Sequence, residues 1–408
     1  MKILIINKFL YPKGGDAISS LNTGELLKSK GHNVIFWGMK DSLNPFYQYQ
    51  DYFVSNIEYN QLQSFKEKIS ATLNILYSFE AKRKVEDLIR KIKPDIAHLN
   101  NFAHQLSPSI LDVFTKYKIP TIMTMRDYKL VCPSYSMFSD GKPCEKCKAG
   151  KYYWCFFKKC TKNSYAKSLL NVMEMYLHHQ ILHLYDLIDI FISPSVFLKN
   201  KLKEMGFKKE IVYLPNLINI KDYIPNYNLD GRTLCYFGRF SREKGLVILL
   251  EAIKGIDISL KIIGDGPVKK DLELRAKSLG LKNVSFLAHK SGEELKKEII
   301  SSMAVILPSE CYENNPRIVL EAFALGKPVI GSRIGGIPEL VQNGETGLTF
   351  EPGNVEDLKN KIEYLIRNPD KISEMGRNAR KFVEENFNPE KHYQDLMKIY
   401  QMAREKCK

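Results

Sequence analysis

The chain has 408 residues and a mass of 47.1 kDa, which is enough for about two to three domains. Hydrophobic residues make up 44% and charged residues 26%, so a wholly disordered chain, a collagen-like fibre and a coiled-coil rod are excluded. No apolar run reaches the ~20 residues of a membrane-spanning helix. The opening segment is too short for a signal peptide and predicts a buried strand. We expect a cytoplasmic protein, or one that docks peripherally on the inner face of a membrane.

Positive charge is concentrated in the first half of the chain. Residues 1–220 contain 31 Lys and Arg against 19 Asp and Glu, a net charge of +12. The remaining residues contain 30 against 27, a net charge of +3. A basic half beside a nearly neutral half favours an anionic partner: nucleic acid, an acidic membrane surface or a phosphorylated substrate. A lysine-rich composition would explain much of the total charge but less of the asymmetry.

The first half alternates short apolar runs with amphipathic segments, as βαβ units do. The first amphipathic segment, residues 17–30, ends at Gly31, a residue type that favours a helix end. We expect buried strands at residues 3–7, 33–37, 95–99, 121–125, 187–193 and 211–214. Residues 128–185 do not follow this alternation. They are rich in Cys, Lys and aromatic residues, contain a long helical stretch at 166–185, and are interpreted as an insertion.

The second half repeats the alternation. We expect strands at residues 233–237, 260–264, 284–287, 304–309, 327–332 and 347–350. Helix starts are indicated by Pro267, by a capping box at Ser291, and by Asn315 as the N-cap of a helix over 316–325. Several strands are apolar without alternation, as when helices cover both faces of a parallel sheet. The sequence predicts an α/β fold of two doubly wound, Rossmann-like domains, with the active site in a cleft faced by the carboxyl ends of the strands.

Two carboxylates lie near a predicted helix start in the second half. In residues 308–316 a strand ends in a polar loop that leads into the helix, so free backbone N–H groups and the helix dipole favour phosphate there. These N–H groups belong to Arg317, Ile318 and Val319. Glu313 lies in the loop and Glu321 in the helix, so one carboxylate can reach each end of a ligand. The alternative for Glu321 is an ordinary acid on a helix surface.

Two glycine-containing loops are further candidates. In residues 238–245, Arg239 and Lys244 place a guanidinium and an ammonium in one loop, which suits a diphosphate. The alternative is that both are solvated loop charges. After the first predicted strand, Gly14 and Gly15 allow the backbone to approach a ligand, although a plain turn has the same pattern.

Together these motifs resemble the donor half of the GT-B glycosyltransferases of glycosyltransferase family 4, which are retaining enzymes. The resemblance rests on the order and spacing of the motifs R-x4-K, G-D-G-P, E-x7-E, G-G-I-P-E and G-x2-G. They begin at Arg239, Gly264, Glu313, Gly335 and Gly344. The resemblance is densest over residues 233–352 and extends to the N-terminal half. There, residues 124–133 and the cysteines that follow resemble a subset of the family that builds surface polysaccharides.

The resemblance implies a role for each of these residues. Arg239 and Lys244 would neutralise the diphosphate of a nucleotide-sugar donor, a UDP-sugar by family frequency, and stabilise the leaving group. Glu313 would hold hydroxyls of the donor sugar, and Glu321 the ribose. The other donor contacts would come from Gly14, Gly15, Gly238, Gly264, Leu287, Asn314, Asn315, Arg317, Ile318 and Val319.

The resemblance also implies a reaction without a cofactor or a catalytic metal, and the sequence contains no D-x-D motif. The acceptor hydroxyl would attack the donor sugar on the face from which the diphosphate departs. The leaving phosphate would accept the proton of that hydroxyl. The acceptor would be a saccharide, lipid-linked and part of surface-polysaccharide synthesis. Residues 1–214 would form the acceptor-binding domain and 215–386 the donor-binding domain, and a helix in 387–408 would pack back on the first.

One motif departs from the family pattern. Where the subset has His-Asp-Tyr, this chain has Arg126 and Asp127 before a tyrosine. An arginine there would add a third cation near the donor, alter donor choice or abolish activity. His98 and His104 remain as acceptor-side candidates, each with a structural role as the alternative.

The insertion contains two further patterns. The spacing of four cysteines fits a structural four-thiolate zinc site, with free thiols as the alternative. These are Cys144, Cys147, Cys155 and Cys160. Aromatic residues at 152–157 lie between Lys151 and the pair Lys158 and Lys159, which is typical of a protein that contacts an anionic bilayer. Base stacking on nucleic acid, or a local core with a basic rim, would have the same pattern.

Three other functions remain as alternatives. In the first alternative the chain is a catalytically inactive sugar-nucleotide binder, for which Arg126 is the indication. In the second it is another GT-B sugar enzyme, of the epimerase or phosphorylase type. A nucleic-acid binder explains the charge but not the pair Glu313 and Glu321, so no nucleic acid is expected as a partner.

Overall fold

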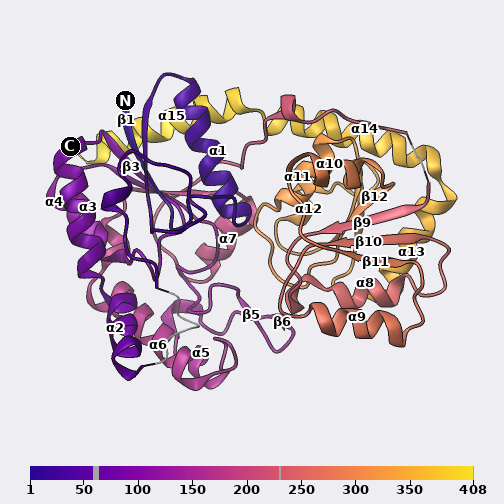
Figure 1. The fold of residues 1–408 in the computed structure, drawn as a ribbon, viewed down its shortest axis with the longest axis horizontal. Helices are drawn as coiled ribbons and strands as arrows, with labels where there is room; N and C mark the ends of the chain where they lie inside the picture. The colour runs from indigo at the N-terminus through magenta and orange to yellow at the C-terminus, as the bar shows by residue number, and fades with distance from the viewer. Residues whose placement is uncertain (58–63, 229–230, 408) are drawn as a thin grey trace. The chain divides into compact units, whose positions relative to one another are not determined.

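The computed structural model describes residues 1–57, 64–228 and 231–407. The chain divides into two compact units. Unit 1 contains residues 1–136, 145–217 and 392–408, and unit 2 contains residues 137–144 and 218–391. Each unit is built around its own parallel sheet (Figure 1).

The sheet of unit 1 has six parallel strands in the order β2-β1-β3-β4-β7-β8. They are β1 (Lys2–Ile6), β2 (Asn33–Trp37), β3 (Ile96–Leu99), β4 (Thr121–Thr124), β7 (Ile190–Ser193) and β8 (Ile211–Tyr213). The direction in which strands are added reverses between β1 and β3, where doubly wound folds place their ligand crevice.

The helices of unit 1 follow the strands and surround the sheet. They are α1 (Gly15–Ser29), α2 (Phe65–Leu76), α3 (Phe79–Ile92), α4 (Leu111–Lys116), α5 (Trp154–Phe157), α6 (Tyr165–Tyr176), α7 (Val196–Glu204) and α15 (Pro389–Lys406). All four residues of β3, β4 and β7 are buried, as expected for strands covered on both faces.

Helix α15 closes one face of the unit 1 sheet. The Tyr400 hydroxyl, fully buried, hydrogen-bonds Nδ1 of His98 in β3 at 2.9 Å. Nε2 of the same ring hydrogen-bonds the Thr124 hydroxyl of β4 at 2.7 Å. The last helix of the chain therefore completes the core that begins with the first strands.

The sheet of unit 2 also has six parallel strands, in the order β11-β10-β9-β12-β13-β14. They are β9 (Thr233–Phe237), β10 (Ser259–Ile263), β11 (Val284–Leu287), β12 (Ala304–Leu307), β13 (Val329–Ser332) and β14 (Gly347–Phe350). The reversal lies between β9 and β12. A short antiparallel hairpin, β5 (Phe138–Ser139) with β6 (Lys142–Pro143), is grouped with this unit although it comes from the insertion.

Helices cover both faces of the unit 2 sheet, and each face has a hydrophobic core (Figure 1). The helices are α8 (Leu246–Ala252), α9 (Lys269–Ser278), α10 (Gly292–Ile300), α11 (Arg317–Ala324), α12 (Ile337–Leu340), α13 (Val355–Arg367) and α14 (Pro369–Asn386). Side chains of α8, α9 and α13 form one core. Side chains of α11 and α12 form the other, and α14 contributes to both.

The predicted fold class, two doubly wound Rossmann-like parallel sheets, is confirmed. Two helix starts were predicted wrongly: the N-cap before α9 is Val268 rather than a residue before Pro267, and α11 is capped by Pro316 rather than Asn315. The start of α10 at Ser291 is as predicted, but Ser291 makes no side-chain cap bond, so the capping box is not formed. The long helix expected over 166–185 ends as an α-helix at Tyr176 and continues as a π-helical turn, Leu177–Ile181.

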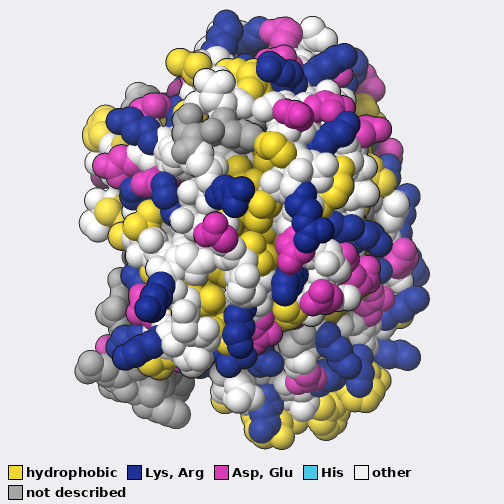
Figure 2. Space-filling view, turned by 90° about the vertical axis from the view of Figure 1, so that its right-hand side faces the viewer, with side chains coloured by type: hydrophobic (Ala, Val, Ile, Leu, Met, Phe, Trp, Pro, Cys, Tyr) yellow, Lys and Arg dark blue, Asp and Glu magenta, His cyan; other side chains and the backbone are white. Residues whose placement is uncertain are grey.

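Charges are mixed on the face shown in Figure 2. Lys and Arg side chains are interspersed with Asp and Glu over this face. Among the residues that the structure describes, no helix is both long and apolar enough to cross a bilayer.

We expect Tyr400→Phe to lower the free energy of unfolding by about 1–3 kcal/mol, because it leaves buried Nδ1 of His98 without its partner. Equilibrium urea denaturation measures the loss. Tyr364→Phe in α13, an exposed tyrosine, is the matched control and is expected to change stability by less than about 0.5 kcal/mol. An equal effect of both variants would contradict the proposed docking of α15.

Candidate functional site

The strongest candidate site lies at the carboxyl edge of the unit 2 sheet, at the reversal between β9 and β12. The loop after β9 carries Lys244, and the loop after β12 carries Glu313. Lys244 Nζ lies 2.6 Å from Glu313 Oε1, and the Ser309 hydroxyl donates to the same oxygen at 2.6 Å. The topology thus joins two residues that are 69 positions apart in the sequence.

Both members of this pair are held in their charged forms. Burial on its own disfavours each charge, but the attraction and hydrogen bond between them outweigh it. The pKa of Lys244 is therefore raised and the pKa of Glu313 is lowered. Within the described chain, both hydrogen bonds to the Glu313 carboxylate use Oε1 and none uses Oε2.

Glycines allow the loops around this pair to pack closely. A Cβ on Gly245 would lie 1.9 Å from the carbonyl oxygen of Pro308, so only glycine brings the two loops together. Gly335 has φ +62°, and a Cβ there would lie 2.5 Å from the backbone N and O of Glu313. The Gly336 N–H donates to the Glu313 carbonyl at 2.8 Å. This turn therefore fixes the backbone that carries Glu313.

The start of α11 lies in the same loop system. Arg317 Nη2 donates to Glu321 Oε1 at 3.0 Å, so Glu321 is paired rather than an isolated surface acid. Nε and Nη1 of Arg317 are buried and make no hydrogen bond to any described residue. The Val319 N–H donates to the Pro316 carbonyl at 3.1 Å. The helix start thus has a cationic side chain with unused donors.

The other donor-side candidates lie at or beside this edge of the sheet. Gly238 and Gly264 directly follow β9 and β10, and Leu287 ends β11. Arg239 is exposed, and its carbonyl accepts from the Tyr236 hydroxyl at 2.9 Å. The loop before α11 contains Asn314 and Asn315, and Ile318 and Val319 belong to its first turn.

In unit 1, polar residues follow β1 and β3, next to the reversal of that sheet. Gly14 is the N-cap of α1 and Gly15 its first residue. Asn101 Nδ2 donates to Asp16 Oδ2 at 2.8 Å, and the Asn101 N–H donates to Asn7 Oδ1 at 3.0 Å. Asn7, Asp16 and Asn101 were not predicted as site residues, although each comes soon after an apolar run, which is where such residues occur.

Arg126 follows β4 and is held by two asparagines. Its Nε and Nη2 donate to Asn100 Oδ1 at 3.2 and 2.8 Å, and its Nη1 donates to Asn216 Oδ1 at 2.6 Å. Asp127, next in the chain, accepts from the Lys129 N–H at 2.9 Å. Burial raises the pKa of Asp127 despite the nearby Lys8 and Lys129. The arginine is thus oriented toward its own unit by neutral acceptors.

The His98 ring lies in the core of unit 1, which favours its structural role over the acceptor-side role. Both ring nitrogens are hydrogen-bonded inside the core, and burial together with the charge of Arg126 lowers the pKa of His98 to about 3. Its position within β3 directs the side chain under α15, away from the loops that follow the strands.

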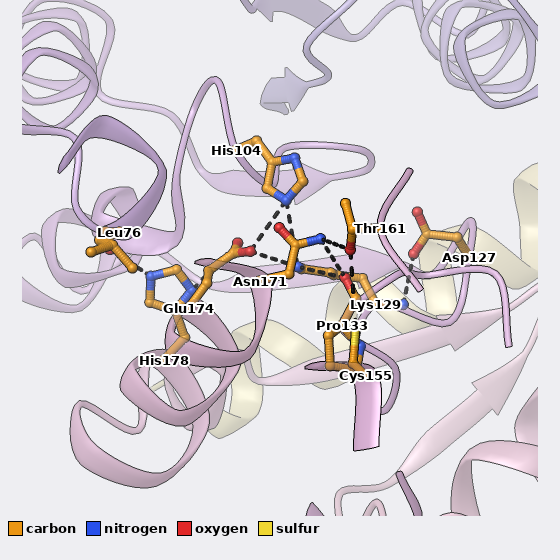
Figure 3. Close-up of polar contacts among 10 residues, drawn as sticks. All are labelled: Leu76, His104, Asp127, Lys129, Pro133, Cys155, Thr161, Asn171, Glu174 and His178. Carbon is orange, nitrogen blue, oxygen red and sulfur yellow. Dashed lines mark hydrogen bonds and ion pairs between the residues drawn. The ribbon is translucent and has the colours of Figure 1, made fainter. Parts of the chain in front are cut away.

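His104 belongs to a buried ionic cluster that joins the insertion to unit 1 (Figure 3). Glu174 of α6 is fully buried, and its Oε2 lies 2.7 Å from Lys129 Nζ and 3.2 Å from His104 Nε2. His178 Nδ1 lies 3.8 Å from the other carboxylate oxygen. Burial opposes ionisation, but the charges of Lys129 and His104 outweigh it, so the pKa of Glu174 is lowered. His104 is thus bound to Glu174 in this cluster.

Glu174 was missed by the sequence reasoning, and one signal was available. It is the single acidic residue between positions 146 and 185, and it stands in a helix whose only other charged residue is Lys167. A lone acid in such a helix commonly has a buried basic partner.

The cysteines of the insertion do not form the predicted zinc site. Among residues 1–57, 64–228 and 231–407, no group of three or more His, Cys, Asp or Glu side chains has the arrangement of a metal site. Cys144 is grouped with unit 2, whereas Cys147, Cys155 and Cys160 belong to unit 1. Hydrogen bonding to Cys160 and burial raise the pKa of Cys155. None of these four cysteines forms a disulfide.

Comparison with known families identifies the chain. Residues 13–222, about half of the sequence, match the family described as Glycosyltransferase Family 4, and residues 220–382 match Glycosyl transferases group 1. This chain belongs to glycosyltransferase family 4. The GT-B fold of this family 4 chain is that of its structural neighbours.

Similar proteins have several different activities. The chain is 33% identical over 213 residues to an uncharacterized glycosyltransferase of Methanocaldococcus jannaschii, a match that covers 52% of this chain and 59% of the relative. It is 36% identical over 153 residues to the D-rhamnosyltransferase of Pseudomonas aeruginosa, covering 37% and 40%. The matched segment therefore spans less than two thirds of either relative.

Solved structures resemble this family 4 chain over nearly its whole length. The sucrose-phosphate synthase of Thermosynechococcus elongatus has a TM-score of 0.73 at 19% identity, with 98% of both chains covered. HepE of Anabaena, in complex with UDP and glucose, has a TM-score of 0.69 at 17% identity, covering 98% of this chain and 99% of that one. At these identities the likeness shows the fold.

We expect Gly335→Ala to lower the free energy of unfolding by more than the ~1–2 kcal/mol of left-handed backbone strain, because the added Cβ also collides with the backbone of Glu313. Gly344→Ala is the matched control: Gly344 has φ +84° and no atom within 4 Å of an added Cβ, so it carries the strain alone. Thermal or urea denaturation of both variants measures the difference. Equal losses of unfolding free energy in the two variants would show that the close approach of Gly335 to the Glu313 backbone adds no cost.

We expect Lys129→Met to lower the free energy of unfolding by about 3–5 kcal/mol, because Glu174 is then a buried charge without its main partner. The double variant Lys129→Met/Glu174→Leu removes both charges and is expected to regain most of the loss. Urea denaturation of the single and double variants measures the coupling, and additive losses would contradict it.

The same pair predicts a pH dependence. The pKa of Glu174 is lower in the folded chain than its unfolded value of ~4.3, so its stabilising effect is complete above that pH and is lost as the pH falls further. The stability difference between the native chain and Glu174→Gln should therefore be constant near neutral pH and shrink below about pH 4.

Proposed function

We propose that this chain is a retaining glycosyltransferase that moves a sugar from a nucleotide-diphosphate donor, a UDP-sugar, to a saccharide acceptor. The observation that carries the proposal is the ion pair of Lys244 with Glu313, at the strand reversal of unit 2. A cation and a carboxylate in contact, both oriented by loops at a ligand crevice, suit a donor with a diphosphate at one end and hydroxyls at the other.

The geometry of the pair supports simultaneous binding of both ends. The Lys244 ammonium has three hydrogens, and Glu313 takes one of them, so others can reach phosphate oxygens. Glu313 Oε2 accepts no hydrogen bond from a described residue and can accept from a sugar hydroxyl. Arg239, which is exposed, would add positive charge for the diphosphate. Glu321 would then bind the ribose.

We propose that the reaction needs no metal ion. Charge on the departing diphosphate would be stabilised by Lys244, which its ion pair with Glu313 orients before the reaction begins, and by Arg239. The acceptor hydroxyl would attack on the face from which the diphosphate leaves and give its proton to the phosphate. No protein base is then required, and the anomeric configuration is retained.

The donor assignment is supported by similar proteins. HepE of Anabaena was solved with UDP-glucose, and TarM of Staphylococcus aureus with UDP. A role for Arg126 as a third cationic contact with the donor stays a prediction, and in unit 1 its guanidinium donates to Asn100 and Asn216.

For the acceptor we propose a lipid-linked saccharide used in surface-polysaccharide synthesis, with the chain bound peripherally to an anionic membrane. The relatives include a D-rhamnosyltransferase, and a structural neighbour is a galactosyltransferase of the lipopolysaccharide outer core. The net charge of +12 on residues 1–220 fits an acidic membrane surface.

The test is donor turnover by the purified chain against a panel of nucleotide-diphosphate sugars, followed by release of UDP or GDP. We expect slow hydrolysis of one donor in water, unchanged by a chelator, and reduced by at least ~100-fold in Lys244→Ala and Glu313→Ala. Lys261→Ala removes a partner from a comparable ion pair on β10, with Glu298 at 2.8 Å, and is the control expected to keep full turnover.

Other outcomes would contradict specific parts of the proposal. Turnover abolished by the chelator would contradict metal independence. Donor binding without turnover, also after addition of membrane extract, would favour an inactive sugar-nucleotide binder. Neither binding nor turnover would show that the donor site is assigned wrongly.

A further inference from the structure

Helix α6 buries an acid and exposes apolar side chains. Its buried face includes Asn171 and the fully buried Glu174 beside Val172 and Met175. Its outer face exposes Tyr165, Leu169 and Met173, with 51%, 45% and 50% of each residue accessible. These three residues recur every four positions and form one stripe along the helix, called the apolar stripe below. In water, such a helix would bury the leucine and methionine and expose the acid.

The hydrogen bonds of the inner face prevent α6 from rotating to bury the apolar stripe. Glu174 is bound to Lys129, and Asn171 Nδ2 donates to the Pro133 carbonyl at 3.1 Å and to the Thr161 hydroxyl at 3.0 Å (Figure 3). A rotation would break this ion pair and leave a buried charge unpaired, at a cost larger than the exposure of three apolar side chains. The outward orientation of the stripe is therefore a stable feature of unit 1.

Aromatic rings from α5 extend the apolar stripe at its N-terminal end. The Phe156 ring lies 5.1 Å from the Tyr165 ring, and Phe157, 63% exposed, lies 5.6 Å from Phe156. Trp154 packs at 6.2 Å from Phe157. Amphipathic aromatic rings of this kind occur where proteins meet the interface of a bilayer.

Seven lysines belong to the same segment of the chain as this apolar surface. They are Lys146, Lys148, Lys151, Lys158, Lys159, Lys162 and Lys167. Lys146 lies over the Trp154 ring at 4.8 Å, and Lys159 over the Tyr165 ring at 4.5 Å. The one acid within residues 145–170, Glu145, is paired with Lys201 at 2.8 Å. The segment therefore combines exposed apolar side chains with a strong excess of positive charge.

We propose that the apolar stripe and the α5 aromatic residues are the surface by which this chain docks on an anionic lipid bilayer. The inference rests on the proposed function for its biological setting, since a lipid-linked acceptor would be found at that surface. Charge complementarity identifies the occupant: cationic side chains bind lipid phosphates while the stripe enters the acyl boundary. Leu169 and Met173 have no ring on which a base could stack, which disfavours single-stranded RNA.

The test is binding to vesicles of phosphatidylglycerol and phosphatidylcholine, measured by co-sedimentation at ~0.1 M salt, against vesicles of phosphatidylcholine alone. We expect binding to the anionic vesicles only. The variant Leu169→Glu/Met173→Glu is expected to weaken it at least tenfold, since it places two carboxylates on the exposed stripe. Leu274→Glu in α9 changes a helical leucine of unit 2 that is 66% exposed, more than Leu169, and this control variant should bind as the native chain does.

Charge is tested by a second pair of variants. Lys167→Glu in α6 should weaken vesicle binding several-fold, and Lys270→Glu in α9, with the same change of net charge, should not. Trp154 fluorescence should shift to the blue on binding, whereas Trp37 is fully buried and contributes a constant background.

Three results would overturn the proposal: no binding to anionic vesicles, binding that Leu169→Glu/Met173→Glu does not weaken, or displacement of the chain from vesicles by an RNA oligonucleotide. Donor turnover is measured on the same samples without vesicles, where the stripe variants should match the native chain. Loss of the docking surface and failure of the proposed function are therefore distinguished, because each has its own readout.

Discussion

The arrangement of this molecule follows from the parallel direction of all strands in its two six-stranded sheets. Parallel strands place every strand-to-helix loop at one edge, so residues distant in sequence meet there without any further device. Lys244 and Glu313 are brought together because β9 and β12 are neighbours, and Arg126 meets Asn100 because β3 and β4 are neighbours. The polar candidate residues of both units are thus concentrated at the carboxyl edges of the sheets, and the faces of the sheets form the hydrophobic cores.

Most of the fold could be predicted from the sequence, because buried parallel strands are short apolar runs between polar loops. β2, β9, β11 and β14 have the predicted limits to the residue. The helix starts were less predictable, since Ser291 has the right residue type but makes no cap bond. The break of α6 after Tyr176 depends on packing against other segments, which periodicity does not report.

For the candidate site, residue types and motif spacing in the sequence identified candidate residues, but they did not predict which side chains contact each other. Lys244 and Glu313 were both singled out, yet nothing local indicates that they pair with each other. His98 has the chemistry of a ligand-binding residue, and only the three-dimensional position of α15 shows that its ring belongs to the core. The cluster around Glu174 was missed because it joins the insertion to His104, 70 residues away, and such pairs leave no periodic signal.

The position of α15 has a consequence for synthesis. Unit 2 is complete once residue 391 has been made, whereas unit 1 still lacks the helix that covers His98 and Thr124. Unit 1 is therefore synthesised first but completed last. Part of its sheet stays uncovered by α15 while unit 2 folds. A premature stop near the end of the reading frame would damage the first unit rather than the second.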